Sequence, residues 1–510
     1  MKLRYLFIAA LAACLVSCES RLDIRQHGVV SMDEFYSTPE DFEEAIASVY
    51  VAYQTNYYNM WFTKEYLSDD LWHGGGTHYD GEDYRLSDYC YNAGLSTLEN
   101  LFSGYYTVLN RANLVIENVP EEESVGKRCV AEARVFRALV NFDLVTLWGT
   151  PPLVDHILAA NEYQPANVES PSVIWAAIEE DLEKAISSGA LTDKSSLSDK
   201  TAHITHQFAK ALLGKAYVFQ GKWGEARIIL DEVVSSEKYD LYDDYATIRT
   251  IAGEFNQESV FELEYPLDSA NPDGNGHRCW QQTYFGLSTR YFSISDDCEL
   301  QDGWNYCHPT KSLYDAFVSI EGVDGYRLNS TIKTLDQIRS LGVEVVERCP
   351  DNEGYFSWKI RIRKDEYQWY NPCINQGVMR FAEVLLLAAE AHLNGGEASV
   401  ATGYINRLRV RAQAPLITGI ATMDDLKNEK RVELCYEMTR YQDLIRWGDA
   451  STVLADKGKH YPNLEVDGSV SYTDLTTSST EYGFKDKHKL LPFPSAEIMS
   501  NVNITQNPGW

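Results

Sequence analysis

Two stretches of the chain combine aromatic residues with glycine, asparagine and aspartate, in runs that show no helical period. A sugar ring has an apolar face of C–H groups, which stacks on Trp or Tyr, and an edge of hydroxyls, which bonds to carboxylates and amides. Such runs offer no helix face to bury a ring, so we predict a sugar-binding surface built from loops. The candidate ligand-binding residues are Trp72, Asp69, Asp70, Trp280, Tyr284, Trp304 and Asn305.

The alternative interpretation places these rings in the hydrophobic core, and it must hold for most of the 33 tyrosines. It is weaker for Trp72, Trp280 and Trp304, because a chain that makes turns cannot bury both sides of a ring. The hydroxyls of a bound sugar need partners from several segments. We therefore expect the regions near residues 70 and 290 to meet in the fold.

Other charged residues favour a structural role over catalysis. Glu383 and Glu390 share a helix face, as a pair of catalytic carboxylates would, but the arginines around them predict a buried ion-pair network. We expect the charges of Arg380/Glu383 and Arg431/Glu433 to be structural. The sequence contains no GxSxG, HExxH or Walker motif. We therefore expect a protein that is not an enzyme and needs no cofactor.

One segment resembles a calcium-binding loop. Asn271, Asp273, Asn275 and Gly276 have the spacing of calcium ligands in such a loop. Its twelfth position is Gln282, which cannot provide the bidentate carboxylate that completes calcium coordination. We expect a solvated turn here, with a structural Ca²⁺ near Asp273 as the weaker alternative.

The cysteines fit an exported protein. Eight follow Cys18: Cys90, Cys129, Cys279, Cys298, Cys307, Cys349, Cys373 and Cys435. Disulfides form in exported chains, and the proximity of Cys279, Cys298 and Cys307 in a loop-rich region favours one bridge there. Pairing cannot be read from sequence. No CxxC spacing occurs, which argues against a zinc site.

The first 17 residues are typical of a lipoprotein signal peptide. Lys2 and Arg4 provide positive charge, and an apolar stretch over residues 6–16 follows, too short to span a membrane. The sequence Leu-Val-Ser-Cys that ends at Cys18 matches a lipobox, in which the cysteine is acylated. Cys14 also fits, but cleavage there would shorten the apolar stretch. We predict lipidation at Cys18, with an ordinary secretory signal as the alternative.

Composition narrows the class of partner. The chain has 510 residues, of which 44% are hydrophobic, and its formal net charge is −30. That length supports a large core. A chain this acidic without a basic stripe is a poor partner for nucleic acid, so we expect none.

Helical periodicity dominates the elements that must position these residues. Residues 381–393 carry a broad apolar face, and Gly395 and Gly396 are typical of a helix C-terminus. A second helix follows, with Pro415 after its end, and Thr422 is a candidate cap for a third. We also predict helices over 101–119, 131–148 and 173–187.

One helical pair has the spacing of a tetratricopeptide repeat. Gly214 and Tyr217 are followed at repeat spacing by Trp223 and Ala226, so small residues allow close helix contact and aromatic residues fill the gap. Repeats of this kind stack into one curved scaffold. Residues 250–376 interrupt it with a strand over 259–265 and a loop-rich run. Within residues 55–95, the part beyond about Leu71 shows no helical period and is predicted to be a loop. Residues 451–489 are also predicted to be a loop.

Four motifs carry a resemblance to a known family. In order they are MRFAEVLLL from Met379, INRLRVRA from Ile405, KRVELCYE from Lys430 and RYQDLIRWG from Arg440. Together they resemble the C-terminal signature of the SusD/RagB family of outer-membrane lipoproteins, which bind glycans for uptake. The family pattern has Arg at the position of Lys430 and Gly at that of Met438, which are mild departures. Further matches at both ends extend the resemblance over almost the whole mature chain.

The resemblance implies a mostly α fold, with about four tetratricopeptide-like helical pairs, long irregular loop-rich insertions and a little β structure. It divides the chain into a signal peptide (1–17), an N-terminal part (18–240) and a C-terminal part (241–510), with a loop-rich 250–376 and signature helices in 377–450. It implies a lipid-anchored protein of the outer membrane that passes glycan to a SusC-like TonB-dependent transporter. The alternatives are a binder of another nutrient, such as peptides, and a glycoside hydrolase.

Overall fold

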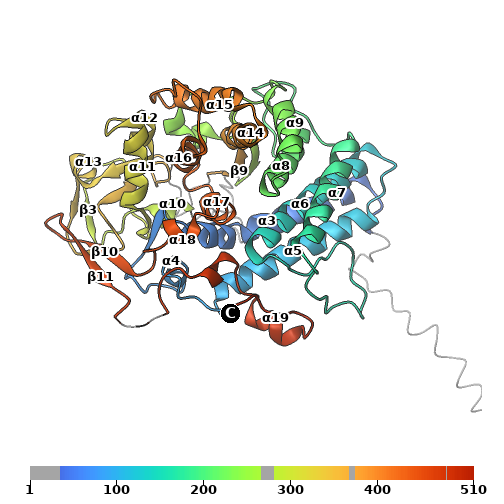
Figure 1. The fold of residues 1–510 in the computed structure, drawn as a ribbon, viewed down its shortest axis with the longest axis horizontal. Coiled ribbons are helices and arrows are strands. Elements are labelled where there is room, and N and C mark those ends of the chain that lie inside the picture. The colour runs from blue at the N-terminus through green and yellow to red at the C-terminus, as the bar shows by residue number, and fades with distance from the viewer. Residues whose placement is uncertain (1–34, 266–280, 367–373, 478, 480) are drawn as a thin grey trace, which may run out of the picture.

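The computed structural model describes residues 35–265, 281–366, 374–477, 479 and 481–510. Its scaffold consists of antiparallel helical pairs, each formed by helices that pack along their length (Figure 1). The mostly α fold with four tetratricopeptide-like pairs is confirmed. The pairs are α3 (Pro39–Tyr66) with α5 (Ser96–Asn118), α6 (Ser124–Trp148) with α7 (Pro171–Ser187), α8 (His206–Phe219) with α9 (Trp223–Val234), and α14 (Phe381–Gly395) with α15 (Ala398–Arg411).

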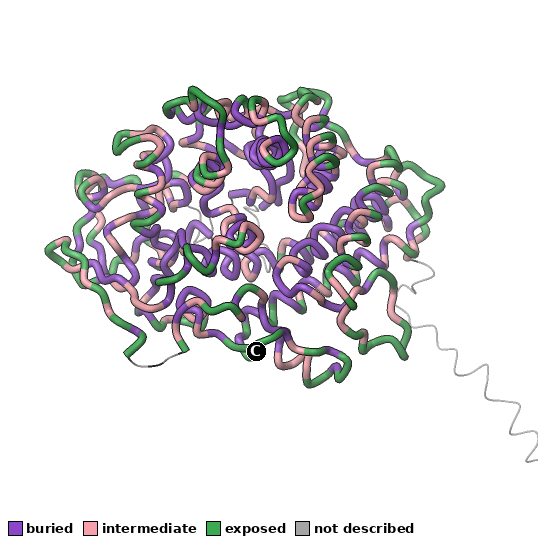
Figure 2. Tube along the Cα trace, in the orientation of Figure 1, coloured by how far each residue is buried: buried purple, intermediate pink, exposed green. Residues whose placement is uncertain are grey.

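The helix that the sequence marked most clearly packs against α15 and α9. Helix α14 is buried from Phe381 to His392, and Figure 2 shows it as a purple core element. It ends as predicted, with Gly396 in the left-handed conformation at φ 95°. Thr422 caps α16 (Met423–Glu433) through a capping box with Asp425.

Close contact between α8 and α9 depends on Gly214. A Cβ atom placed on Gly214 would lie 2.5 Å from the side chain of Leu230 on α9. The small residue therefore lets the two helices approach, as the repeat spacing predicted.

The remaining helices and strands belong to the excursions from the scaffold. The helices are α4 (Tyr84–Ser87), α10 (Gln281–Phe285), α11 (Lys311–Glu321), α12 (Tyr326–Thr331), α13 (Leu335–Ser340), α17 (Arg440–Trp447), α18 (Ala450–Val453) and α19 (Ser495–Ser500). The antiparallel strands are β1 (Leu71–Gly74) with β4 (Tyr306–Pro309), β2 (Ser259–Leu263) with β9 (Gln376–Arg380), β3 (Phe292–Ile294) with β6 (Val343–Val345), β5 (Ile332–Thr334) with β8 (Tyr355–Ser357), and β10 (His460–Leu464) between β7 (Cys349–Pro350) and β11 (Val470–Asp474). The predicted strand over 259–265 is confirmed as β2.

Two expectations about loops are wrong in part. The stretch beyond Leu71 is not all loop, because it contains strand β1 and the short helix α4. Residues 451–489 contain the hairpin β10–β11, whose turn has Gly468 at φ 87°. Its Asp467-Gly468 dipeptide between alternating residues is a hairpin signal that the sequence carried.

A second, smaller core supports the excursion between β2 and β9. It includes Phe292, Ile338, Val343, Phe356 and Leu464, all buried. This core holds β3, β6 and α13 beside the scaffold, and so fixes the segments that flank residues 281–310.

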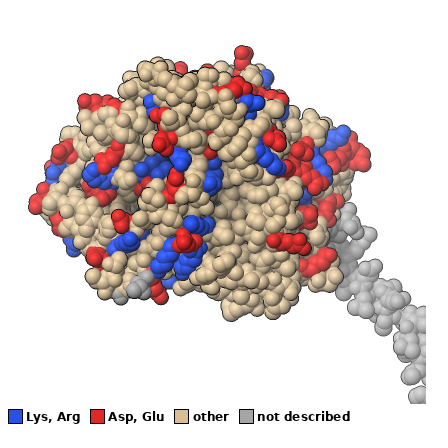
Figure 3. Space-filling model, in the orientation of Figure 1, with Lys and Arg blue, Asp and Glu red and all other residues tan. Residues whose placement is uncertain are grey.

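Surface charge is uneven. In Figure 3, carboxylates gather over the side of the molecule where α7 lies, whereas Lys and Arg are more frequent toward the middle of the same face. Among the described helices, none has the combination of length and apolar character that crossing a membrane requires.

Candidate ligand-binding surface

The two aromatic-rich regions of the sequence meet through strands β1 and β4. In this ladder Trp72 pairs with His308 and Gly74 pairs with Tyr306. Farther along, the Arg290 guanidinium donates to the Gly76 carbonyl at 2.8 Å, and the Tyr291 hydroxyl donates to the same oxygen. The prediction that the regions near residues 70 and 290 meet is therefore confirmed.

The loop that carries Trp304 is held by backbone contacts. The Trp304 N–H donates to the Thr283 carbonyl at 2.9 Å, and the Asn305 N–H donates to the Gly286 carbonyl at 2.7 Å. A Cβ on Gly303 would lie 2.5 Å from the Cα of Gly286, so the two segments touch backbone to backbone. Asn305 adopts a positive φ of 63°, a strained geometry for a residue with a side chain. These contacts hold the backbone from which the Trp304 side chain projects.

Four rings from three segments form what we call the Trp304 cluster: Trp304, Tyr284, Tyr306 and Tyr58. Tyr284 makes edge contacts with Trp304, at 4.9 Å between ring centroids, and with Tyr306, at 5.3 Å. Tyr58 on α3 lies 6.4 Å from Tyr284. Trp304 is 42% exposed, and the other three rings are half-buried. The cluster thus presents one partly exposed indole beside half-buried rings.

A second group of rings, the Tyr79 cluster, consists of Tyr79, Tyr84, His78 and Tyr461. Tyr79 is 52% exposed and makes an edge contact with Tyr84, at 5.2 Å between centroids. The His78 ring stacks on Tyr461 at 3.7 Å. The ring of His73 lies between the clusters, 6.3 Å from Tyr84 and 5.2 Å from Tyr306. Aromatic contacts therefore run continuously from Trp304 to Tyr79.

His78 fixes the Tyr79 cluster through two buried carboxylates. Its ring nitrogens lie 2.9 Å from Asp351 and 2.8 Å from Asp88. Burial alone would lower the pKa of His78, but the two carboxylates outweigh it and raise the pKa to about 10. The imidazole is therefore charged at neutral pH, and it ties the loop after β1 to the segments around residues 88 and 351.

Trp304 is exposed, as the sequence predicted, and Tyr284 is half-buried beside it, but the other described candidates are buried. Trp72 is only 7% exposed, and its indole N–H donates to Glu353 at 2.9 Å. The expectation that it presents a ring to solvent is wrong, because β1 is covered by residues 353 and 457, which are distant in sequence. Trp280 lies outside the described residues.

The expected polar partners are also buried. Asp69 pairs with Arg440 and Arg431 at 2.8 Å, and Asp70 pairs with Arg431 at 2.8 Å. Asn305 is fully buried, and its side-chain amide donates to the Gly75 carbonyl at 3.3 Å. The expectation that these three residues reach sugar hydroxyls is wrong, because protein groups already occupy them.

Sequence reasoning did not single out Tyr306, Tyr58, Tyr79 or Tyr84. Tyr306 follows Trp304 by two residues, the spacing that places side chains on one face of an extended chain, and this signal could have found it. Tyr58 comes from α3, and no local pattern links it to the loops.

The signature arginines and glutamates form a buried network, as predicted, but with other partners. The Arg327 guanidinium lies 2.7 Å from Glu433 and 2.8 Å from Glu429, and all three side chains are fully buried. Arg380 and Arg411 also contact Glu433. Glu383 pairs with Lys215 at 2.8 Å, and Arg431 pairs with Asp69 and Asp70, so the pairs Arg380/Glu383 and Arg431/Glu433 do not form.

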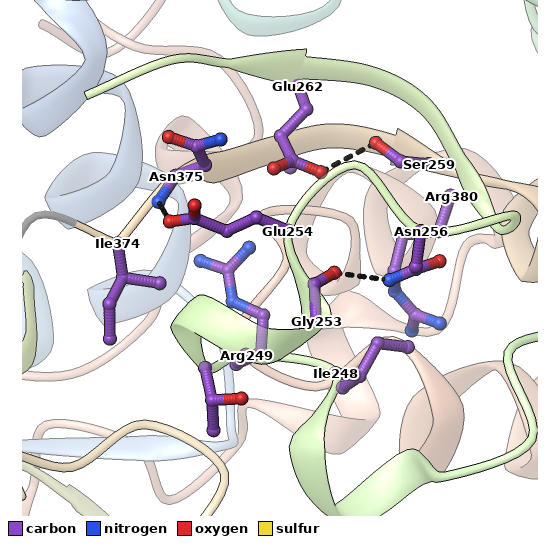
Figure 4. A pocket seen from close by; sticks show the side chains of 12 residues that line it. Ile248, Arg249, Gly253, Glu254, Asn256, Ser259, Glu262, Ile374, Asn375 and Arg380 are labelled. Atoms are coloured by element: carbon purple, nitrogen blue, oxygen red, sulfur yellow. Dashed lines mark hydrogen bonds between the residues drawn. The ribbon is translucent and has the colours of Figure 1, made fainter. Parts of the chain in front are cut away.

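Two cavities lined by described residues are poor candidates for a sugar-binding site. Figure 4 shows a polar pocket beside β2 and β9, where Glu254 accepts from the Asn375 N–H at 2.9 Å. Its volume of about 20 Å³ suits a water molecule and excludes a sugar ring. A cavity of about 230 Å³ between α6 and α7 is lined by Lys127, Arg134 and Lys184 but by no aromatic residue.

The metal and disulfide expectations fall partly outside the described residues. The calcium-like segment at Asp273 lies there, as do Cys279, Cys373, Cys14 and Cys18. Cys298 and Cys307 are buried free thiols, so a bridge between these two is excluded. Within the described residues, no group of three His, Cys, Asp or Glu side chains could hold a metal ion.

Comparison with known proteins gives consistent matches at both ends of the chain. A family model described as "SusD family" matches residues 350–510. A second, described as "Starch-binding associating with outer membrane", matches residues 29–218. The chain is 24% identical to a SusD-like protein of Bacteroides ovatus, over 100% of this chain and 98% of the relative. It is 22% identical to the starch-binding protein SusD of Bacteroides thetaiotaomicron, over 77% and 74% of the two chains.

Solved structures agree with the sequence matches. A laminarin-binding SusD-like protein superimposes with a TM-score of 0.78 and 28% identity, over 92% of this chain and 99% of that one. Surface glycan-binding protein A from Bacteroides thetaiotaomicron, in complex with laminarihexaose, has the same fold with a TM-score of 0.72 and 22% identity, over 92% and 100%. The chain belongs to the SusD/RagB family, whose members are binding proteins of the outer membrane rather than enzymes.

Proposed function

We propose that this protein captures a glycan at the cell surface through the aromatic surface formed by the Trp304 and Tyr79 clusters. The observation that carries the proposal is the Trp304 indole, which is 42% exposed and contacts Tyr284, on a backbone held by the contacts of Gly303 and Asn305. An exposed ring on a rigid base is what stacking on a sugar requires, because little rotamer freedom is lost on binding.

Relatives support a glycan as the ligand. One solved relative is named for binding laminarin, and another contains laminarihexaose. A binder of peptides on the same scaffold is the alternative, and the two differ in which ligands they retain. The structure does not favour the glycoside hydrolase alternative, because Asp69 and Asp70 are held in ion pairs with Arg431 and Arg440.

The substitution Trp304→Ala tests the site. Loss of one stacking ring should weaken glycan binding by roughly 1–3 kcal/mol, the scale of burying a large apolar side chain. The melting temperature should barely change, because an exposed ring supports little packing. A polysaccharide panel identifies a retained glycan, and calorimetric titration then measures its affinity for each variant.

The matched control is Tyr163→Ala, which removes an aromatic ring that is 68% exposed and lies outside both clusters. Its affinity should equal that of the wild type. Normal binding by Trp304→Ala would place the site elsewhere. Retention of peptides but of no glycan in the panel would favour the alternative ligand.

The second part of the proposal concerns the location of the protein in the cell. We infer that the chain is processed before Cys18 and that the acylated cysteine anchors it to the outer membrane, in keeping with the lipobox and with the outer-membrane association of the family. Cys18→Ala should move the protein from the membrane fraction to the soluble fraction. Release by Cys14→Ala and not by Cys18→Ala would assign the lipid to the other cysteine.

The third part concerns delivery. The family resemblance supports a SusC-like TonB-dependent transporter as the partner that receives the glycan. Affinity purification of the tagged protein from its native membranes should recover a TonB-dependent barrel in stoichiometric amount. Recovery without any barrel would contradict this partnership and leave glycan capture as a separate result.

A further inference from the structure

Two carboxylates border the aromatic surface, and each is held by one of its oxygens. Asp80 Oδ2 accepts from the Gly76 N–H at 2.7 Å and from the Tyr306 hydroxyl at 3.0 Å. Asp83 Oδ1 accepts from the Thr97 hydroxyl. The second oxygen of each carboxylate accepts no hydrogen bond from the residues that the structure describes, and both side chains are partly exposed. Each is therefore an oriented acceptor with an open position.

Asp80 lies directly at the rings, and Asp83 directly precedes Tyr84 of the Tyr79 cluster. Asp80 contacts the Tyr306 hydroxyl, and a Cβ on Gly75 would lie 2.6 Å from the Tyr306 ring, so this ring, Asp80 and the loop backbone are packed together. Burial, and then the charge of Asp83, raise the pKa of Tyr284 to about 12. The carboxylates thus lie beside the base on which Trp304 stands.

The described cations beside this surface have other partners: His78 pairs with Asp351 and Asp88. Arg290 donates to the Gly76 carbonyl at 2.8 Å and lies 3.4 Å from Glu347. Arg85 lies over the Tyr84 ring, with 5.9 Å between its guanidinium carbon and the centroid. Neither forms an ion pair with Asp80 or Asp83 within the described chain. A negative field therefore remains at the surface, in a protein of net charge −30.

We propose that Asp80 and Asp83 make this surface specific for uncharged glycan chains, an inference that rests on the proposed glycan-binding function. Their open oxygens accept hydrogen bonds from sugar hydroxyls, which are donors that every neutral sugar offers. Their charge repels chains that carry carboxylate or sulfate groups, because like charges at a partly desolvated surface cannot both be accommodated without a cation. The same two residues thus bind neutral chains and repel anionic ones.

The test uses pairs of polysaccharides that differ only in charge. Each neutral polysaccharide of a panel that includes laminarin is compared, in native affinity gels, with the same polymer after oxidation of its primary hydroxyls to carboxylates. The wild type should be retarded by a neutral polymer and not by its oxidised form. Added salt should reduce the difference, because screening weakens repulsion between exposed charges.

The variants assign the effect to residues. Asp80→Asn and Asp83→Asn should each weaken binding of the neutral chain by about tenfold, because a neutral acceptor forms a weaker hydrogen bond than a carboxylate. The double variant should gain retention by the oxidised polymer. Asp324→Asn, an exposed carboxylate outside the aromatic surface, is the matched control and should behave as the wild type. Thermal melts identify any variant that has lost its fold.

The outcomes are distinct. Equal retention of the wild type by neutral and oxidised polymers would overturn the specificity. Discrimination that persists unchanged in the folded double variant would overturn the role of Asp80 and Asp83 while leaving glycan binding intact. Absence of retention by every polymer in the panel would refute the proposed function itself, and this inference with it.

Discussion

The buried charges of the signature helices give a prediction at the scale of single residues. Arg327 is fully buried and contacts Glu321, Glu429 and Glu433. Removal of Arg327 leaves these carboxylates without their shared cation inside the protein, which costs about 3–5 kcal/mol. Arg327→Met should therefore lower the free energy of unfolding by this amount in urea denaturation.

The control is Arg227→Met, which removes an arginine from a partly exposed pair with Glu397. Pairs of this kind contribute about 0–1 kcal/mol. If both variants lost the same small amount of stability, the network around Arg327 would not be the structural element that its burial indicates. Glycan affinity should be unchanged in both, because neither arginine lies in the aromatic surface.

The pH dependence of stability follows from three buried carboxyls. Burial would raise the pKa of Asp69, but Arg431 and Arg440 lower it to about 2, and Arg380 and Lys359 likewise lower that of Glu437 to about 2 despite burial. The unfolded values are about 3.9 and 4.3. Because the folded values are lower, stability is present above the unfolded pKa and is lost as pH falls toward 2.

Glu65 acts in the opposite direction. Burial raises its pKa to about 8, so its contribution is present below about pH 4 and is lost as pH rises through 8. Urea denaturation across pH should therefore show a decline on both sides, and Asp69→Asn should flatten the acid side. Constant stability from pH 5 down to pH 2 would contradict the assigned ion pairs.

At the scale of elements, the loop of Trp304 depends on two glycines in contact. Gly303→Ala would place a methyl group 2.5 Å from the Cα of Gly286 and 2.6 Å from the Thr283 carbonyl. The segments must separate, and Trp304 must move with them. We expect this variant to lose glycan affinity to the same extent as Trp304→Ala, measured by calorimetric titration.

Gly403→Ala is the matched control for that substitution. Gly403 lies in α15, where a Cβ would meet nothing within 4 Å, so alanine should stabilise the helix by roughly 0.5–1 kcal/mol. Its affinity for glycan should not change. Normal binding by a folded Gly303→Ala protein would show that the contact between the two loops does not position the indole.

The sequence was most informative where the cause of structure is local. The end of α14 at Gly396 and the cap of α16 at Thr422 depend on neighbouring residues, and both predictions are confirmed. The hairpin β10–β11 was missed although its Asp467-Gly468 turn signal is also local. Trp72 could not be placed, because the residues that cover it, Glu353 and Lys457, come from distant segments.

The candidate surface shows the same difference between local and long-range causes. Tyr284 and Trp304 lie in a run whose composition disfavours complete burial, and the structure leaves Trp304 exposed and Tyr284 half-buried. Asp69 and Asp70 have equally polar neighbours, yet arginines more than three hundred residues away hold them in the interior. Composition predicts which residues resist burial, whereas long-range pairing decides which of them reach solvent.

At the scale of the whole molecule, the ladder of β1 and β4 has a consequence for folding. The scaffold pairs α6 with α7 and α8 with α9 join helices that are neighbours in sequence. The ladder instead joins segments far apart, as in the hydrogen bond from the Thr310 hydroxyl to the Asp69 carbonyl, 241 positions away. Closing so long a loop costs entropy before any contact compensates, so such pairings form slowly.

The aromatic surface should therefore be the last part of the protein to reach its native structure. During refolding from urea, helical circular dichroism should recover before the protein regains the ability to bind glycan, and the delay should vanish in experiments that start from a folded protein. With such a delay, a newly exported chain would pass through a helical state that cannot yet hold its ligand. A single common time course for both signals would contradict this and show that the ladder forms together with the scaffold.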